Sequence, residues 1–313
     1  YNKWRSVGIF TRINYSYADR YLIQFNGRYD GSSKFPSNSR WAFFPSVSAG
    51  WRITEEPWVR DNIGKRYFSN AKLRLSFGSL GNSNVSPYYY DETFGISNSR
   101  YINGGIYRKT SAPDPIPGNL TWETSRTYNL GLDLGFFQDR LSLSGDIYLR
   151  KTLDMFTDGP TIQAVYGAAS PKGNYAELST RGFELSVSWK DDFKLGNRNF
   201  SYNVKATLSD NVSKIDRFNN ALKNIGGRNT PEYYEGMIIG EIWGFVCNGL
   251  WQSQEEIDAA EAGARAAGQG HYDTLFQFSS DYSMHPGDMK IEDLNGNGYL
   301  DRGDQTLSNP GDR

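Results

Sequence analysis

A short acidic segment near the end of the chain, residues 293–304, has the residue types and spacing of a calcium-binding loop. In EF-hand loops, oxygen ligands stand at positions 1, 3, 5, 7, 9 and 12, and a glycine at position 6, here Gly298, permits the sharp turn. Position 12 carries Asp304 instead of the usual bidentate glutamate, which predicts weak affinity for calcium. Weak affinity suits a site in the calcium-rich fluid outside a cell. The alternative is an Asn/Gly turn that needs no ion, and the sequence leaves both open. The candidate ligands are Asp293, Asn295, Asn297, Tyr299 through its carbonyl, Asp301 and Asp304.

Residues for acid–base or nucleophilic catalysis are scarce. His271 and His285 are the only histidines, and both lie in the last long connector. The sequence contains no GxSxG, HExxH, CxxC or P-loop motif. A hydrolase built on strands needs a Ser–His pair on one strand face, and no histidine lies on any predicted strand. The sequence therefore predicts no enzyme.

Aromatic residues gather in one long connector, residues 79–123. They are Tyr88, Tyr89, Tyr90, Tyr101, Tyr107 and Trp122. Such rings stack on sugars or grip peptides, but they equally well pack the connector against itself. The sequence leaves the two interpretations open and assigns no substrate-binding residue.

The elements that position these groups are predicted to be strands. Apolar and polar residues alternate in eight segments, so that each strand has one apolar and one polar face. Length and alternation match transmembrane β-strands, which span the bilayer with about 9–11 residues. Strands of soluble sandwiches are shorter, with a mode of about five or six residues. The segments are residues 7–17, 21–29, 47–53, 71–78, 128–136, 141–150, 183–190 and 201–208.

Charged residues lie deep within the polar faces, as a water-filled lumen permits. They are Arg12, Arg28, Arg74, Asp133, Asp146, Glu184 and Lys205. We expect Leu73, Leu132, Leu143 and Val187 to face lipid, and Arg74, Asp133, Ser144 and Ser186 to face the lumen.

The connectors and aromatic residues indicate the same fold. Shorter and longer connectors mostly alternate, as in outer-membrane barrels with short periplasmic turns and long outer loops. Aromatic residues cluster beside the connectors at one end, which is typical of the girdle at a membrane interface. These residues are Tyr15, Tyr17, Tyr21, Trp51, Phe136, Trp189 and Tyr202. The sequence predicts an all-β, transmembrane antiparallel barrel.

Strand counting suggests that these eight strands are an arc of a larger barrel. If the turn at residues 18–19 is periplasmic, the first strand begins outside and the eighth ends outside. A complete bacterial barrel normally has both ends in the periplasm. We therefore expect further strands on both sides.

Composition excludes other classes of protein. A mean hydropathy of −0.63 and the lack of a long apolar run exclude a helical membrane protein. Lys+Arg (34) and Asp+Glu (35) nearly balance, which argues against a nucleic-acid partner. A single cysteine, Cys247, forms no internal disulfide. One helix is predicted, over residues 253–268, where Ser253 and Glu256 have the spacing of a capping box.

Several motifs resemble those of SusC/RagA-type TonB-dependent outer-membrane transporters. They include DGSSKFPSNSRWAFFPSVSAGWRITEEPW at residues 30–58, LRLSFGSLGN at 73–82, NYAELSTRGFELSVSW at 174–189 and GDMKIEDLNGNGYLDRGDQ at 287–305. They occur in family order and cover nearly the whole chain.

The resemblance implies a barrel of about 22 strands, plugged by an N-terminal domain, driven by TonB and capped by a SusD-like surface lipoprotein. Residues 1–313 would then be a C-terminal part of the barrel domain, without plug or final strands, in the cell outer membrane. The resemblance implies nutrient import, most often of oligosaccharides, with oligopeptides as the main competitor. A passive porin and a soluble β-rich binding module are the remaining alternatives.

Overall fold

The computed structural model describes residues 3–60, 68–102, 105–110, 113, 115–118, 120–159, 163, 165, 170–196, 198–218, 233–241, 243–266, 284–292 and 305–307. The chain divides into two compact units. The first comprises residues 1–222 and 234–236, and the second comprises residues 223–233 and 237–313. Within the described residues, no helix is long and apolar enough to cross a membrane.

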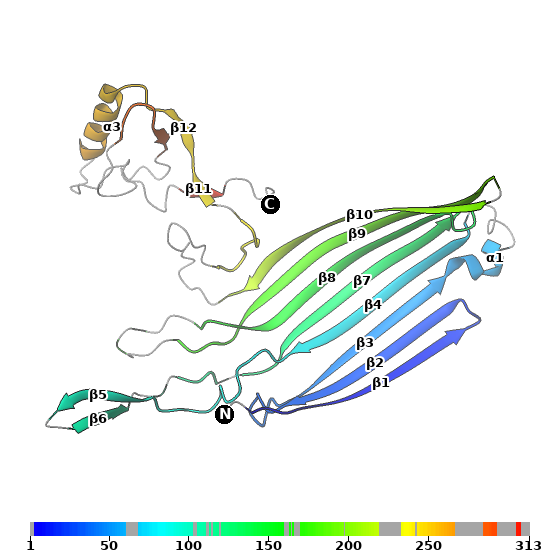
Figure 1. The fold of residues 1–313 in the computed structure, drawn as a ribbon, viewed down its shortest axis with the longest axis horizontal. Helices are drawn as coiled ribbons and strands as arrows, with labels where there is room; N and C mark the ends of the chain where they lie inside the picture. Colours follow the sequence, from blue (N-terminus) through cyan, green and yellow to red (C-terminus); the bar gives the residue numbers. More distant parts are fainter. Residues whose placement is uncertain are drawn as a thin grey trace. The chain divides into compact units, whose positions relative to one another are not determined.

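The first unit is built on one eight-stranded antiparallel sheet in which each strand lies beside the next along the chain (Figure 1). A small hairpin, β5 (Ile96–Ile102) and β6 (Gly105–Thr110), is inserted between β4 and β7 and stays outside this sheet. The eight predicted strands are therefore confirmed. They are β1 (Ser6–Tyr17), β2 (Tyr21–Ser32), β3 (Trp41–Arg52), β4 (Asn70–Asn82), β7 (Glu123–Phe136), β8 (Leu141–Thr157), β9 (Gly173–Leu195) and β10 (Arg198–Arg217).

The register gives the sheet two chemically different faces. Leu73 lies opposite Leu132, and Leu143 lies opposite Val187. In the adjacent row, Asp133, Ser144 and Ser186 are aligned across β7, β8 and β9. Because successive residues of a strand point to opposite faces, the leucine rows define an apolar face and the aspartate row a polar face. The predicted separation of the two sets is confirmed.

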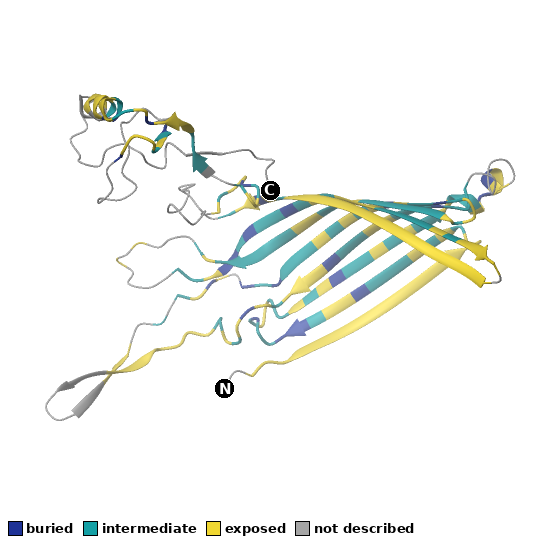
Figure 2. Ribbon diagram, turned by 45° about the horizontal axis from the view of Figure 1, so that its top comes forward, coloured by how far each residue is buried: buried dark blue, intermediate teal, exposed yellow. Residues whose placement is uncertain are grey.

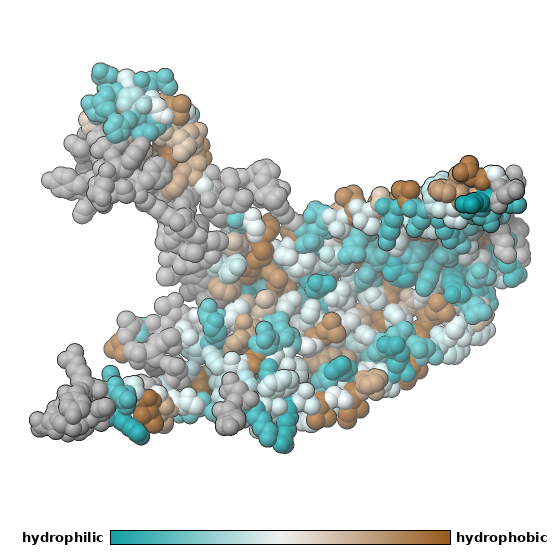
Figure 3. All heavy atoms as spheres, in the orientation of Figure 1, coloured by the Kyte–Doolittle hydropathy of each residue, from teal (hydrophilic) through white to brown (hydrophobic). Residues whose placement is uncertain are grey.

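The apolar face is open to the surroundings. Ile13, Leu75, Ile147 and Leu208 are 60%, 52%, 58% and 61% exposed. Figure 2 shows exposed residues along β1 and a mixture of exposed, intermediate and buried residues along the strands inside the sheet, and Figure 3 shows hydrophobic residues scattered among hydrophilic ones. A contiguous apolar surface on this scale marks contact with a membrane or another protein.

Several strands are longer than the alternation predicts. β8 has 17 residues, β9 has 23 and β10 has 20. The predicted end of β9 near Lys190 was too early because Asp191 and Asp192 resemble a turn. In the structure, the alternation continues through them to Phe193, whose ring lies 5.2 Å from that of Phe200 on β10.

The connectors mostly alternate in length between the two ends of the sheet, as predicted; the exception is the connector of residues 53–69, which is longer than that of residues 33–40 at the other end. At one end the turns are tight. Ala18 and Asp19, in the three-residue turn between β1 and β2, have φ of 50° and 52°, the left-handed conformation that tight hairpin turns use. Gly196 closes β9 to β10 with φ +64°. The same end carries a connector of moderate length, residues 53–69, with η1 (Ile53–Glu55) and α1 (Pro57–Val59). At the other end, residues 33–40, 83–122 and 158–172 form the long connectors.

A small hydrophobic core closes the long-connector end of the sheet. It consists of Phe35, Phe44, Val85, Leu120 and Trp122. The ring of Trp122 lies 4.8 Å from that of Phe35 and 5.6 Å from that of Phe44. Because Phe44 belongs to the polar face of β3, this core holds Phe35, Val85, Leu120 and Trp122 of two long connectors over that face.

The second unit is small. Its two-stranded sheets are β11 (Trp243–Phe245) with β14 (Gln305–Leu307), and β12 (Cys247–Leu250) with β13 (Met289–Ile291). Helix α3 (Gln254–Ala266) confirms the predicted helix and packs Ile257 against Trp251 and Met284. The Ser253 hydroxyl accepts a hydrogen bond from the amide of Glu256 (3.3 Å), as a capping box requires. The Glu256 carboxylate bonds the amide of Gln252 (3.0 Å) instead of that of Ser253.

Candidate functional site: the polar face of the sheet

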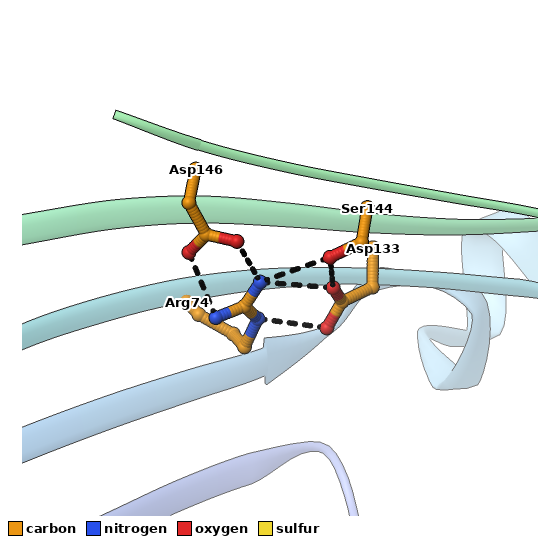
Figure 4. Close-up of polar contacts among 4 residues, drawn as sticks. All are labelled: Arg74, Asp133, Ser144 and Asp146. Atoms are coloured by element: carbon orange, nitrogen blue, oxygen red, sulfur yellow. Dashed lines mark hydrogen bonds and ion pairs between the residues drawn. The ribbon is translucent and has the colours of Figure 1, made fainter. Parts of the chain in front are cut away.

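The most connected group on the polar face is Arg74 on β4, with Asp133 on β7 and Asp146 on β8 (Figure 4). Its Nε and Nη2 donate to Asp133 Oδ2 (2.8 Å) and Oδ1 (2.9 Å). Its Nη1 and Nη2 donate to Asp146 Oδ1 (3.0 Å) and Oδ2 (2.8 Å). The Ser144 hydroxyl donates to Asp133 Oδ1 (2.8 Å). Two bidentate carboxylates thus hold one guanidinium, which joins three strands and leaves one net negative charge.

Gly131 makes room for this arrangement. It lies opposite Arg74 on one side and opposite Asp146 on the other. A Cβ at this position would stand 2.6 Å from Arg74 Cζ and 2.5 Å from Asp146 Oδ1. The guanidinium therefore lies flat across β7 only because position 131 has no side chain.

A cavity of about 710 Å³ opens on the polar face toward the long-connector end. Its lining combines uncharged hydrogen-bonding groups, aromatic rings and one ion pair, and it includes Asn26, Ser46, Thr127, Trp4, Phe44 and Trp122. In the ion pair, Arg28 Nε donates to Asp30 Oδ2 (2.6 Å). Asp30 Oδ1 is buried and has no hydrogen-bond partner within the described part of the chain. Polar groups beside rings are typical of ligand sites.

The connector aromatics whose side chains the structure describes pack within the protein. The Tyr88 hydroxyl donates to the Lys3 carbonyl (2.9 Å), and that of Tyr90 to the Ser33 carbonyl (3.4 Å). The Tyr89 hydroxyl accepts from the Lys172 amide (2.8 Å), and Trp122 lies in the core. Self-packing therefore accounts for these rings. The side chains of Tyr101 and Tyr107 lie outside the described residues.

Asn174 links the same connector to the sheet. It is 2% exposed, and its Nδ2 donates to the carbonyls of Thr121 (3.0 Å) and Asp154 (2.6 Å). Its Oδ1 accepts from the Thr121 amide (2.9 Å). The segment that carries Trp122 is therefore held firmly at the start of β7.

The aromatic residues at the tight-turn end form a belt. Rings of Tyr17 and Tyr21 stack at 6.4 Å, and the Trp189 indole donates to the Tyr202 hydroxyl (3.1 Å). Phe136 contacts Phe68 (5.1 Å). The predicted girdle residues therefore lie at one end of the sheet.

Glu56 anchors the connector at this end. Its Oε1 accepts from the Tyr21 hydroxyl (2.6 Å) and the Trp51 indole (3.0 Å), and its Oε2 from Arg20 Nη1 (3.1 Å). These donors, the Tyr21 hydroxyl first and the Trp51 indole next, hold the pKa of the Glu56 carboxyl below its usual value.

The six candidate calcium ligands of residues 293–304 all lie outside the described residues, so the predicted loop stays a prediction. His271 also lies outside them. His285 is described, and its amide donates to Asp288 Oδ2 (2.8 Å).

The Arg74 cluster was missed because its members were predicted singly. The signal was present, since Phe136 and Leu141 flank a tight turn and pair directly. Counting back from that pair aligns Asp133 with Ser144 and Gly131 with Asp146.

Comparison with known proteins agrees with this architecture. The family profile described as "TonB dependent receptor-like, beta-barrel" matches residues 2–306. TonB-dependent receptor P3 of Formosa agariphila is 30% identical over 98% of this chain and 29% of its own length. TonB-dependent receptor SusC of Bacteroides thetaiotaomicron is 30% identical over 96% of this chain and 28% of its own length.

Solved structures give the same result. A structure of the RagAB peptide transporter has a TM-score of 0.65 at 26% identity, over 79% of this chain and 26% of that one. The RagAB peptide importer in its closed-closed state has a TM-score of 0.68 over 96% of this chain and 30% of that one; at 22% identity it shows the fold alone. The chain thus spans less than a third of the length of these relatives. With a profile match over nearly its whole length and a two-faced antiparallel sheet, the chain belongs to the TonB-dependent receptor β-barrel family, whose place is the outer membrane.

Proposed function

We propose that this chain forms part of the barrel wall of a TonB-driven importer of oligosaccharides, with TonB engaged through parts of the protein outside the chain. The observation that carries the proposal is the polar face, with its cavity of about 710 Å³. An importer needs a wet, hydrogen-bonding wall inside and an apolar wall toward lipid, and the two faces supply both.

Oligosaccharides suit the chemistry of the polar face. One row across the sheet consists almost entirely of uncharged hydrogen-bonding side chains, Asn14, Gln24, Ser48, Ser76, Asn129, Tyr148 and Asn211. Sugar hydroxyls both donate and accept, and they pair with such amides and hydroxyls without the desolvation cost of a charge. The half-exposed ring of Trp4 beside the cavity offers a stacking surface.

Oligopeptides are the second candidate, and a specific observation favours them. The RagAB peptide transporter shares this fold at 26% identity. The Arg28–Asp30 pair in the cavity would suit the charged ends of a peptide.

The partners follow from the same family. We propose that a SusD-like surface lipoprotein seats at the long-connector end, where the ordered core presents a firm surface. We also propose that residues 1–313 are one part of the barrel domain, and that further strands and a plug complete the protein. The edge strands β1 and β10 support this, since no described strand pairs with their outer edges, and an unpaired edge is not tolerated in lipid.

The test uses the full-length transporter with its lipoprotein in its own cells. Accumulation of fluorescent oligosaccharides and oligopeptides is measured with and without a protonophore. The variant Thr127→Trp fills the cavity and should abolish uptake. Leu130→Trp, on the apolar face of the same strand, should not. Sugar uptake that depends on energy and on Thr127 supports the proposal. Uptake of peptides alone supports the second candidate. Uptake that the protonophore does not reduce indicates a passive porin.

A further inference from the structure

Four cations interrupt the apolar face at its long-connector end. They are Arg126 on β7, Lys151 on β8, Arg181 on β9 and Lys214 on β10, and they are called the basic patch below. All four side chains are exposed. Each follows the apolar side chains of its strand in the same alternation: Arg126 after Tyr128, Lys151 after Leu149 and Arg181 after Phe183. The basic patch therefore faces outward with the apolar rows, away from the polar face.

The register brings these cations together. Arg126 pairs directly with Lys151, and Lys151 with Ser179, which in turn pairs with Lys214. Arg181 is the diagonal neighbour of Lys151 and Lys214. Directly opposed side chains have Cβ atoms about 4.5–5.5 Å apart, and diagonal ones lie at about 7–8 Å. Like charges at such spacing destabilise a sheet unless an anion lies among them.

Two of the acidic side chains nearby are engaged by other groups. Glu177 accepts from Arg217 Nε (2.9 Å) and pairs with its Nη2 (2.8 Å), and Asp216 accepts from the Ser179 hydroxyl (2.9 Å). Asp210, one row nearer the apolar band, neighbours Arg181 diagonally. None of the four cations takes part in a hydrogen bond or ion pair with any residue that the structure describes.

The depth of the basic patch matches the headgroup level of the membrane. On β8, the apolar face runs from Leu141 to Leu149 without a charge before Lys151. Ten residues at about 3.3 Å each, tilted by about 40°, raise Lys151 roughly 25 Å above Leu141. That is the height of the apolar band of an outer-membrane barrel. The aromatic belt and the short periplasmic turns lie at the opposite end of the sheet, so the basic patch lies at the outer leaflet.

We propose that the basic patch binds the phosphate of an anionic outer-leaflet glycolipid, lipid A being the probe of that class. The guanidinium groups of Arg126 and Arg181 would take phosphate oxygens in bidentate fashion, with the Lys151 ammonium between them as a point charge. The acyl chains would lie along the leucine rows beneath. This inference rests on membership of the outer-membrane family and is independent of the cargo.

The experiment measures binding of fluorescent lipid A to the full-length transporter in nanodiscs of uncharged phospholipid. Each surface cation contributes about 1 kcal/mol toward an anionic lipid, so each loss should weaken binding about fivefold, and Arg126→Gln with Lys151→Gln roughly thirtyfold. Lys151→Arg keeps the charge and should bind as the wild type does. Dephosphorylated lipid A should bind weakly to every form.

Arg150→Gln is the matched control, since Arg150 is the next residue on β8 and lies on the polar face. It should leave lipid A binding unchanged. Wild-type affinity in the double variant, equal binding of the dephosphorylated lipid, or an equal loss in Arg150→Gln would overturn the proposal. Each variant is first checked for heat-modifiable mobility on gels, and Lys151→Gln alone serves if the double variant does not fold.

Discussion

At the scale of single residues, Arg74 makes four charge-assisted hydrogen bonds to the carboxylates of Asp133 and Asp146 within the barrel wall. Its side chain is 32% exposed, and those of Asp133 and Asp146 are 28% and 17% exposed. Water therefore still reaches the group, which makes it weaker than a fully buried pair but stronger than a surface one. Because Arg74 forms bonds across three strands, it fixes their register.

Replacing Arg74 by Ala should lower the free energy of unfolding by about 1–3 kcal/mol, because two carboxylates then face each other without a cation. Urea unfolding of the full-length transporter in liposomes measures this. Arg12→Ala is the control on the same face, since Arg12 donates a single bond to Asn26 (2.7 Å) and is exposed. An equal loss of unfolding free energy in both variants would show that Arg74 does not fix the register of the strands.

The connector residue Glu56 predicts a pH effect. Its pKa is lowered in the folded protein, chiefly by the Tyr21 hydroxyl and then the Trp51 indole. A lowered folded-state pKa gives stability above the unfolded-state value, near 4.5, which is lost as pH falls through the folded value. Glu56→Gln should thus be less stable than the wild type at neutral pH, with the gap closing in acid. A gap that stays constant from neutral pH into acid would contradict this.

The acidic segment 293–304 remains a calcium prediction. Without a cation, Asp293, Asp301 and Asp304 would repel one another, so binding should order the segment. Calcium titration of the full-length transporter, read by protease cleavage in this segment, tests it, with Asp293→Ala and Asp304→Ala as controls. Cleavage that ignores both chelator and substitution would leave the Asn/Gly turn as the explanation.

At the scale of elements, alternation predicted every strand of the sheet and both of its faces. The predicted strands end too early. Asp191 and Asp192 at one end of the sheet and Lys151 at the other resemble the start of a loop, but the strands continue through them. The same early stops hid the basic patch, although extending the alternation by a residue pair past Leu149 or Phe183 finds Lys151 and Arg181. The hairpin β5–β6 was missed as well, since nothing in its pattern distinguishes it from the connector around it.

The two faces predict opposite responses to a charge. Leu132→Arg places a cation toward mid-bilayer lipid and should cost about 2–4 kcal/mol, whereas Ser186→Arg faces the lumen and should cost much less. Equilibrium unfolding of the full-length transporter in liposomes gives both values. Equal costs would mean that the faces are wrongly assigned.

At the scale of the whole molecule, the sheet has two open edges. β1 is exposed along its whole length, and β10 nearly so. Neither edge has a strand partner among the described residues. The Arg74 cluster and the core around Trp122 stabilise the interior of the sheet, but they do not provide hydrogen-bond partners for the backbone groups at these edges.

Residues 1–313 produced alone should therefore fail to give the compact, heat-modifiable band on cold SDS gels that folded barrels give. The backbone groups of β1 and β10 would lack partners in the micelle. The full-length transporter is the positive control. A compact band from the isolated chain would show that the sheet closes on itself.

The meander of neighbouring strands also limits how such a protein changes over generations. Deleting one codon within β7 would exchange the faces of every later residue in that strand and turn Asp133 toward lipid. Gene variants that lengthen or shorten strands should then be rare. The long connectors face no such rule, and the hairpin β5–β6 lies within one of them, outside the main sheet. New surface recognition should therefore evolve through changes in the length of the long connectors, while the strands keep their lengths.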